Sequence, residues 1–343
     1  MIQIRTARFP HPEPLHDKLV LLPVFLPFAG CPGRCVFCDQ HAQTGTAGMD
    51  LEQALRELGE RLSLMPGPYG LGFFGGTFTG LAPEWQDRFL EVAGRFRDVG
   101  ALVHLRVSTR PDRIDPSTLT RLRSSGVSMV ELGVQTFDSQ VLERSGRGYD
   151  AVLAARACNM VREAGLELGI QLLPGLPGHE PGHWREDVRR TLSLKPDVVR
   201  IYPCVVMAGT GLADMHARGE YEPWPLETAV AESGWALLRF WEAGVRVIRL
   251  GLAGEQGMLS RLVAGPWHPA FGNMARSLAL RYFLEERLRV AQGRVKRIFL
   301  PRRLGGELWG HGRANVPALA RLGIVKERVE FWSEQDIALE MEE

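Results

Sequence analysis

Short apolar runs alternate with amphipathic segments along most of this chain. Between about residues 19 and 250, each apolar run is followed by a segment whose apolar residues recur at helical spacing. The apolar runs predict strands over residues 19–25, 71–74, 101–108, 127–134, 166–173, 198–202 and 245–250. The amphipathic segments predict helices over residues 51–64, 83–97, 117–124, 150–164, 183–193 and 226–243.

This alternation predicts an α/β fold in which crossover helices connect the strands of a parallel sheet. Glycine-rich or polar segments follow the first five predicted strands. They are residues 31–38, 75–77 and 109–111, then Gln135, and residues 174–178. In a barrel these points share the face where active sites lie. We therefore expect a partial or full TIM-like (β/α) barrel rather than an open doubly wound sheet.

The pattern changes after about residue 252. The chain then predicts a helix over residues 273–291, a basic strand over 294–300, a glycine-rich loop over 305–312, a short helix over 316–322 and an acidic tail. We predict a barrel domain over residues 1–252, in which residues 1–18 form an N-terminal extension. A small α+β C-terminal extension is expected over residues 253–343.

Composition limits the partners. The 343 residues carry a net charge of +1, so overall charge predicts no polyanionic partner. Locally, residues 276–328 hold 13 Lys or Arg against 4 Asp or Glu, and residues 329–343 hold six acids and no base. This basic segment is either an RNA-contacting surface or an ordinary solvated face. No apolar run is long enough to span a membrane and no signal peptide is evident, so we expect a cytoplasmic protein with no membrane partner.

Three of the five cysteines lie in the run Cys31-Pro32-Gly33-Arg34-Cys35-Val36-Phe37-Cys38. Thiolates at this spacing can turn toward one centre, which suits a cubane iron–sulfur cluster with one iron free of protein ligands. The alternatives are a zinc site, for which His41 stands at an unfavourable offset, and a disulfide loop. The other two cysteines, Cys158 and Cys204, lie in apolar surroundings and are expected to be buried in a reducing compartment.

The cysteine spacing resembles that of the radical S-adenosylmethionine (SAM) superfamily. The resemblance implies a 4Fe–4S cluster on Cys31, Cys35 and Cys38, with SAM on the fourth iron. Reductive cleavage of SAM would yield a 5′-deoxyadenosyl radical. It also implies that Phe37 packs against the adenine of SAM. The glycine motif Gly75-Gly76-Thr77 would contact the amino group of SAM, with Thr77 in place of the usual acid.

A longer series of motifs resembles the catalytic subunit of Elongator. The series comprises residues 74–81, 108–112, 130–136, 144–148, 174–178, 200–203 and 246–250, in that order. Oxygen-independent coproporphyrinogen III oxidase shares a shorter version. By this resemblance Gln135 and Arg147 contact the ribose and carboxylate of SAM. Ser108 stands where relatives often carry a Glu, and Gln171 where they often carry Asp or His.

The Elongator subunit continues into an acetyltransferase domain, for which the roughly 90 residues after 252 are too few. A near match to its phosphate loop, residues 302–307, ends in Glu307, which would repel a pyrophosphate. We therefore expect no acetyl-CoA chemistry within this chain, which looks similar to a stand-alone bacterial group of Elongator-like proteins.

The expected function is that of a radical SAM enzyme that takes electrons from a donor such as flavodoxin or ferredoxin. Its substrate is unidentified, and a tRNA nucleoside is one candidate. The alternatives are a small metabolite, as in the coproporphyrinogen oxidase relatives, and a non-enzymatic iron–sulfur protein that binds RNA or regulates. Two residues keep two interpretations each. Glu131 is either a paired buried acid or a site residue, and His268 is either a substrate-side group or a structural loop histidine.

Overall fold

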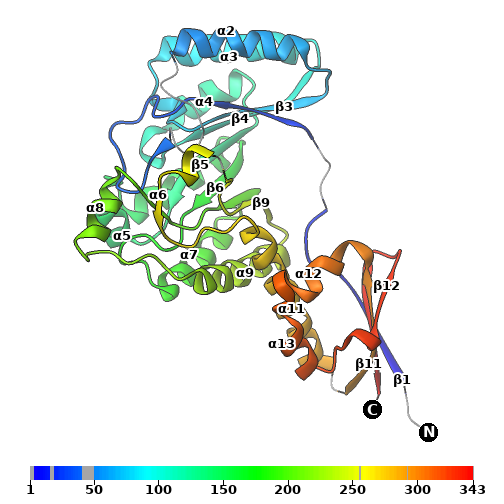
Figure 1. Ribbon diagram of the computed structural model, residues 1–343. Helices are drawn as coiled ribbons and strands as arrows, with labels where there is room; N and C mark the ends of the chain where they lie inside the picture. Colours follow the sequence, from blue (N-terminus) through cyan, green and yellow to red (C-terminus); the bar gives the residue numbers. More distant parts are fainter. Residues whose placement is uncertain (1–3, 16–18, 41–49, 255, 292, 343) are drawn as a thin grey trace.

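The computed structural model describes residues 4–15, 19–40, 50–254, 256–291 and 293–342. His41, considered above as a zinc ligand, lies outside these residues. The described chain forms a curled α/β unit and a smaller sheet-and-helix unit beside it (Figure 1). None of the described helices is long and apolar enough to cross a membrane.

A seven-stranded parallel sheet forms the larger unit. Its strands lie in chain order: β2 (Leu21–Phe25), β3 (Tyr69–Phe74), β4 (Leu102–Thr109), β5 (Met129–Gln135), β6 (Glu167–Leu172), β7 (Val198–Ile201) and β9 (Arg246–Leu250). Within the described chain β2 and β9 are edge strands, so the sheet is a curled half-barrel. The predicted partial TIM-like fold is therefore confirmed, and each predicted strand is present with its ends shifted by a few residues.

Helices connect the strands and cover the outside of the sheet. They are α2 (Leu51–Leu64), α3 (Pro83–Asp98), α4 (Pro116–Ser124), α6 (Ala151–Glu163), α7 (Pro181–Ser193) and α9 (Leu226–Glu242). Three begin at an aspartate whose carboxylate accepts a backbone N–H of the first turn: Asp50, Asp115 and Asp150. Both faces of the central strands are covered, which is why β3 and β5 are buried throughout and read as continuous apolar runs.

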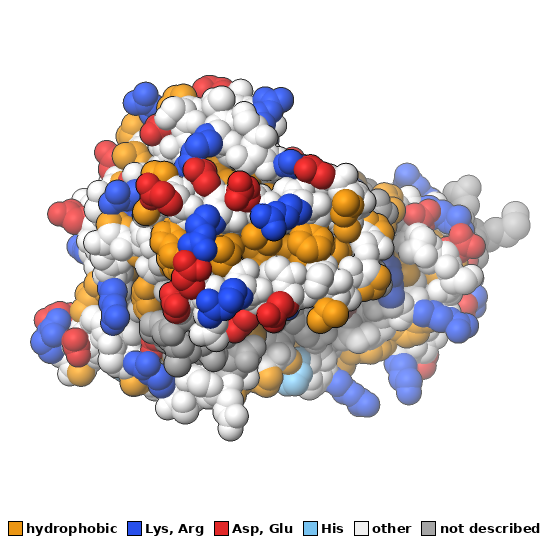
Figure 2. Space-filling view, turned by 90° about the horizontal axis from the view of Figure 1, so that it is seen from above, with side chains coloured by type: hydrophobic (Ala, Val, Ile, Leu, Met, Phe, Trp, Pro, Cys, Tyr) orange, Lys and Arg blue, Asp and Glu red, His pale blue; other side chains and the backbone are white. Residues whose placement is uncertain are grey.

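The face of the molecule on which α2 lies carries mixed charges. Figure 2 shows Lys or Arg and Asp or Glu side chains interspersed there, with apolar side chains between them. The Arg88 guanidinium of α3 bonds both carboxylate oxygens of Glu52 on α2, at 2.6 and 2.7 Å. This face therefore offers no single-sign patch to a polyanion.

The smaller unit contains a four-stranded sheet in the order β1 (Ile4–Pro10), β13 (Asp336–Glu342), β11 (Arg294–Pro301) and β12 (Val329–Trp332). It packs on α11 (Phe271–Ala291), together with α12 (Gly305–Trp309) and α13 (Val316–Arg321). One expectation is wrong here: the expected loop over residues 305–312 contains α12. The acidic tail forms β12 and β13, two strands for which no prediction was made. In β13 the acids alternate with Ile337, Leu339 and Met341, which face the core.

The structure also differs from the predicted division of the chain at its N-terminus. Strand β1 was assigned to the barrel segment, yet it pairs along its whole length with β13 (Figure 1). The chain thus enters through the smaller unit, crosses to the half-barrel and returns. Pairing across more than 300 residues leaves no local sequence signal.

The basic and acidic segments of the sequence lie side by side in this sheet. Arg294 stands opposite Glu342 and Arg297 opposite Glu340 on paired strands. The Arg297 guanidinium lies 3.1 Å from the Glu330 carboxylate on β12. The charge separation seen along the chain is therefore partly neutralised in space, which weakens the electrostatic argument for an RNA-contacting extension.

Several short elements had no counterpart in the predicted pattern. They are α5 (Ser139–Arg144), α8 (Gly211–Ala217), α10 (Gln256–Leu259), β8 (Val206–Met207) and β10 (Leu262–Ala264). Strands β8 and β10 form a separate antiparallel pair. Each is shorter than the window over which periodicity can be read.

The two units meet around His11, which directly follows β1. Its ring packs edge-on against Trp241 of α9, with centroids 5.1 Å apart, and lies 6.4 Å from the ring of Phe283 on α11. Burial, aided by the charge of Arg303, lowers the pKa of His11 from 6.5 to about 4, against the opposing effect of Glu13. The folded protein therefore holds this imidazole neutral.

This burial predicts a pH-dependent stability. Between pH 6.5 and 4 the unfolded chain protonates His11 while the folded chain does not, so the free energy of unfolding falls as the pH is lowered. The pKa difference of about 2.5 corresponds to at most about 3 kcal/mol. In His11→Phe this part of the loss should disappear, as measured by urea unfolding at several pH values. An unchanged pH dependence in His11→Phe would contradict the prediction.

Candidate functional site

A cavity of about 490 Å³ opens at the carboxyl ends of the half-barrel strands. All ten residues predicted for the cluster and for SAM line it: Cys31, Cys35, Cys38, Phe37, Gly75, Gly76, Thr77, Ser108, Gln135 and Arg147. They come from segments up to 116 residues apart in the chain. The loops after parallel strands meet at one edge, as the sequence pattern predicts.

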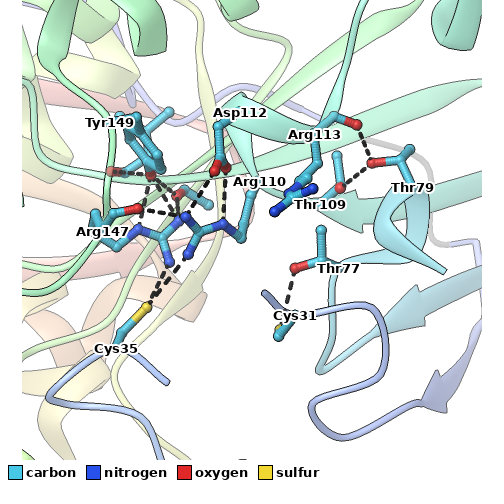
Figure 3. Close-up of polar contacts among 12 residues, drawn as sticks. Cys31, Cys35, Thr77, Thr79, Thr109, Arg110, Asp112, Arg113, Arg147 and Tyr149 are labelled. Atoms are coloured by element: carbon cyan, nitrogen blue, oxygen red, sulfur yellow. Dashed lines mark hydrogen bonds and ion pairs between the residues drawn. The ribbon is translucent and has the colours of Figure 1, made fainter. Parts of the chain in front are cut away.

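The cysteine loop, residues 26–40, crosses this edge, and its three cysteines line the cavity. Figure 3 shows the contacts of two of them, Cys31 and Cys35. The Cys31 thiol lies 3.2 Å from the Thr77 hydroxyl. The Cys35 thiol accepts a hydrogen bond from Arg147 at 3.1 Å and a longer one from Arg110 at 3.7 Å. The Cys31 thiol thus contacts the glycine motif, and the Cys35 thiol contacts Arg147, the residue predicted to bind the carboxylate of SAM.

The chemistry of these thiols fits an iron–sulfur cluster. Burial, reinforced by the neighbouring Cys35 and Cys31 thiols, raises the pKa of Cys38 to about 12. A bound cation would favour the deprotonated form of such a thiol. Among the described residues no three His, Cys, Asp or Glu side chains converge on a single-ion position. A cluster of several irons would not require the three thiols to gather about one ion.

The two other readings of the cysteines find no support in the described chain. A mononuclear zinc site needs ligands gathered about one ion at roughly 2.3 Å from each sulfur. The disulfide loop fails because all five cysteines are free. Cys158 and Cys204 are buried, as predicted.

The cysteine loop is anchored from several directions. The backbone of Val36 donates to the Ser145 carbonyl at 3.3 Å and accepts from the Leu212 N–H at 2.8 Å. The carboxylate of Asp39 lies 2.8 Å from the guanidinium of Arg261, which also donates to the Ala208 carbonyl at 2.6 Å. Segments before and after the last barrel strand therefore hold the loop in place.

The glycines after β3 are required by the backbone itself. A Cβ on Gly76 would lie 2.3 Å from the Ala29 carbonyl oxygen and 2.6 Å from that of Leu26. Gly75 has a φ of +89°, which favours glycine. Thr77 N–H donates to the Ala29 carbonyl at 2.8 Å. The glycine motif therefore seats the cysteine loop against the end of β3, in addition to lining the cavity.

Gln135 ends β5 in an unusual conformation. Its φ of +72° places a non-glycine residue in the left-handed region, and its side chain is buried in the cavity wall. Such strain costs on the order of 1–3 kcal/mol and tends to occur at functional sites. Beside it, the Gln171 amide donates to the Ser108 hydroxyl at 2.8 Å, so these two predicted positions engage each other.

Arg147 is held in place by buried groups. Its Nε donates to the Tyr149 hydroxyl at 2.9 Å, and its other nitrogens donate to the Gly133 carbonyl and to Cys35 (Figure 3). Arg110 bonds both oxygens of Asp112, at 2.9 and 3.0 Å. The Arg110 charge is thus compensated by a carboxylate, whereas no described carboxylate pairs with Arg147.

Glu131 proves to be a paired buried acid. Its carboxylate is 1% exposed and lies 2.6 Å from the Arg200 guanidinium of β7 and 3.3 Å from that of Arg106 on β4. Neither Glu131 nor Arg106 lines the cavity, but Arg200 does. Glu131 therefore acts on the site by holding Arg200.

His268 lies away from the described cavity wall. Its Nδ1 accepts the Ala270 N–H at 3.0 Å, and its ring lies 5.0 Å from that of His311. Its loop position therefore supports the structural interpretation. Sequence reasoning missed four polar wall residues: Arg110, Arg200, Tyr202 and Arg249. Each lies in or just after a predicted strand, inside the motif series, which was the available signal.

A cysteine loop at the carboxyl edge of a parallel half-barrel defines an α/β protein of the radical SAM type. The Radical SAM superfamily profile matches residues 25–191, and the Radical SAM C-terminal domain profile matches residues 196–279. Together they match nearly three quarters of the chain, which belongs to the radical SAM superfamily of enzymes. Members of this superfamily bind a 4Fe–4S cluster and SAM.

The relatives confirm the resemblance predicted from the motif series. The chain is 32% identical over 176 residues to the tRNA uridine(34) acetyltransferase of Methanocaldococcus jannaschii, covering 46% of this chain and 32% of that protein. It is 25% identical over 189 residues to the heme chaperone HemW of Bacillus subtilis, covering 54% and 50%. The chain thus spans a third to a half of the length of these relatives.

A solved structure agrees with the fold. That of the archaeal Methanocaldococcus infernus Elp3, with an N-terminal deletion, superposes with a TM-score of 0.59 at 22% identity. The match covers 78% of this chain and 63% of that one. At this identity the likeness supports the half-barrel architecture alone.

The buried ion pairs of Glu131 predict a stability effect. Glu131→Gln leaves two guanidinium groups facing a neutral amide, so the free energy of unfolding should fall by about 3 kcal/mol. Urea unfolding of both proteins at one pH measures this. Glu52→Gln is the matched control: it breaks the surface pair with Arg88, whose carboxylate is 45% exposed, and should change stability little. If the free energy of unfolding fell equally in Glu131→Gln and Glu52→Gln, the buried ion pairs of Glu131 would contribute no more to stability than a surface pair, which would contradict the prediction.

Proposed function

We propose that Cys31, Cys35 and Cys38 hold the 4Fe–4S cluster and that the adjoining wall holds SAM. The observation that carries this proposal is that all ten residues named from the sequence line one cavity. Arg147 suits the SAM carboxylate because its buried guanidinium has no described carboxylate partner. Phe37, Gly75, Gly76, Thr77 and Gln135 complete the SAM wall, with Ser108 placed beside them by Gln171.

When bound, the cluster supplies an electron that cleaves SAM reductively to methionine and a 5′-deoxyadenosyl radical, which takes a hydrogen atom from the substrate. The chain's own residues prepare this chemistry. Arg147 and Arg110 both donate hydrogen bonds to the Cys35 sulfur and so hold it at the cavity wall. The Gly75-Gly76 turn lets the ligand approach the backbone, and Phe25 and Phe74 give one side of the cavity an apolar surface.

For the substrate we favour a nucleoside of tRNA. The support is the similarity to proteins named tRNA uridine(34) acetyltransferase, together with the motif series shared with Elongator. A small metabolite is the second candidate, supported by the similarity to an oxygen-independent coproporphyrinogen III oxidase of Paracoccus denitrificans, 31% identical over 166 residues. Electrons would come from a donor such as reduced flavodoxin or ferredoxin.

Removing one thiol should abolish both cluster and activity. After anaerobic reconstitution with iron and sulfide, Cys35→Ala should bind substantially less iron and sulfide, lack the reduced-cluster electron paramagnetic resonance signal and form no 5′-deoxyadenosine from SAM. Cys158→Ala, a buried cysteine of α6 far from the site in sequence, is the matched control and should keep all three properties. If Cys35→Ala still bound a full cluster and cleaved SAM, the assignment of Cys35 as a cluster ligand would be wrong.

The tRNA candidate predicts a substrate effect. Bulk tRNA should increase 5′-deoxyadenosine formation by the reconstituted protein several-fold, because substrate consumes the radical productively. The same tRNA digested with ribonuclease should not. Liquid chromatography of reaction products measures both. If intact and digested tRNA behave alike, the small-metabolite candidate is favoured instead.

A further inference from the structure

Four arginines line the cavity, and no Asp or Glu stands among its described wall residues. Two of the four have carboxylate partners: Arg110 pairs with Asp112 and Arg200 with Glu131. Arg147 and Arg249 have no such partner in the described chain. The Arg249 Nε donates a hydrogen bond to the Gly251 carbonyl at 3.3 Å. The cavity therefore presents two positive charges that the surrounding protein leaves uncompensated.

These two charges lie on different parts of the wall. The Arg147 guanidinium is bonded to Gly133 on β5, while Arg249 belongs to the edge strand β9 and its Nε contacts Gly251. Strands β5 and β9 are three strand spacings apart, about 14 Å along the sheet. If Arg147 holds the SAM carboxylate, Arg249 remains for a second anion.

The backbone aims Arg249 into the cavity beside other polar groups. A register shift between Val199 and Arg200 places Arg249 directly opposite Arg200 on the paired strand. Arg200 also donates to the Tyr202 hydroxyl at 3.2 Å, and Tyr202 lines the same wall. The edge position leaves Arg249 exposed, so a ligand can reach it from outside without crossing the SAM wall.

The wall across from β9 is apolar. It is formed by Leu21, Pro23 and Phe25 of β2 with Phe74 of β3. The curl of the sheet brings the Arg200 guanidinium to 4.8 Å from the centre of the Phe74 ring, across the barrel interior. The rings of Phe25 and Phe74 lie 6.2 Å apart. The Arg200 guanidinium covers the Phe74 ring, so Phe25 is the aromatic ring of this wall that a ligand can reach, and Arg249 is the exposed guanidinium.

We infer that Arg249 binds an anionic group of the substrate, a phosphate or a carboxylate, while a flat ring of the same molecule lies against Phe25, which is 37% exposed. An arginine fork bonds either anion through two N–H groups. The inference rests on the proposed function, because it assigns Arg147 to SAM. It narrows the substrate class to an anionic molecule with a planar part, such as a nucleotide or a carboxylated aromatic ring.

Binding of matched probe pairs tests this inference. Uridine 5′-monophosphate is compared with uridine, and benzoate with benzyl alcohol, by isothermal titration of the reconstituted, SAM-saturated protein. At least one anionic probe should bind more tightly than its neutral partner and lose about tenfold in affinity in Arg249→Gln. Preference for the nucleotide identifies a phosphate, preference for benzoate identifies a carboxylate, and both results support the subsite.

Arg246→Gln is the matched control, since it removes the same charge from the same strand at a position outside the described cavity wall. It should leave probe affinity unchanged. Equal losses in both variants, or no preference for either anion, would overturn the inference. A different result would separate the two proposals. If the wild-type protein does not cleave SAM but still binds the anion through Arg249, the proposed function is contradicted and the anion subsite is supported.

Discussion

The site depends on one close contact between backbones: the cysteine loop lies directly on the turn that follows β3. A Cβ on Gly30 or on Gly80 would come within 2.3 Å of an opposing backbone atom, as would one on Gly76. No flexible side chain can give way there, so a larger residue would lift the loop off the strand end. The Cys31 thiol contacts Thr77, and the Cys35 thiol contacts Arg147, because the backbone of the loop packs directly against the turn after β3. The glycines that resemble a ligand motif are therefore first a packing requirement.

Buried charge gives the cavity its second constraint. Glu131 of β5 forms ion pairs with Arg106 of β4 and Arg200 of β7, which lie on opposite sides of β5 in the sheet. The second pair holds Arg200 in the cavity wall. Buried ion pairs contribute little net stability, because desolvation offsets most of the attraction. Their consequence here is positional. The carboxylate leaves Arg200 compensated and rigid, and Arg249 beside it uncompensated, so the polar wall has one fixed group and one group available to a ligand.

Sequence patterns predicted the half-barrel well because parallel strands covered on both faces appear as continuous apolar runs. The ten residues predicted for the cluster and for SAM meet in one cavity for a related reason, since they lie at the ends of strands or in the loops that follow them, at the shared edge. The strand order of the smaller sheet was not predictable, because β1 and β13 are joined only by long-range pairing. In β13 the alternation of acids with apolar residues was an available signal, which the prediction of an acidic tail did not use. Arg200, Tyr202 and Arg249 were also missed, because only the curl of the sheet and a register shift bring them to the cavity.

The smaller unit is joined to the half-barrel by specific side-chain contacts. Its first strand leads through His11 onto Trp241 of α9, and Arg276 of α11 bonds both Glu13 and Glu307. The chain between β9 and α11 carries Arg261, whose ion pair with Asp39 reaches back to the residue after Cys38. The same segment begins beside Arg249. One stretch of chain thus leads from the proposed anion subsite, past the anchor of the cysteine loop, into the helix that carries the smaller sheet. Helix α11 packs on both α9 and the small sheet, so this stretch of chain ends on the helix that joins the two units. The anchors of the cysteine loop itself lie in the half-barrel and its connecting loops.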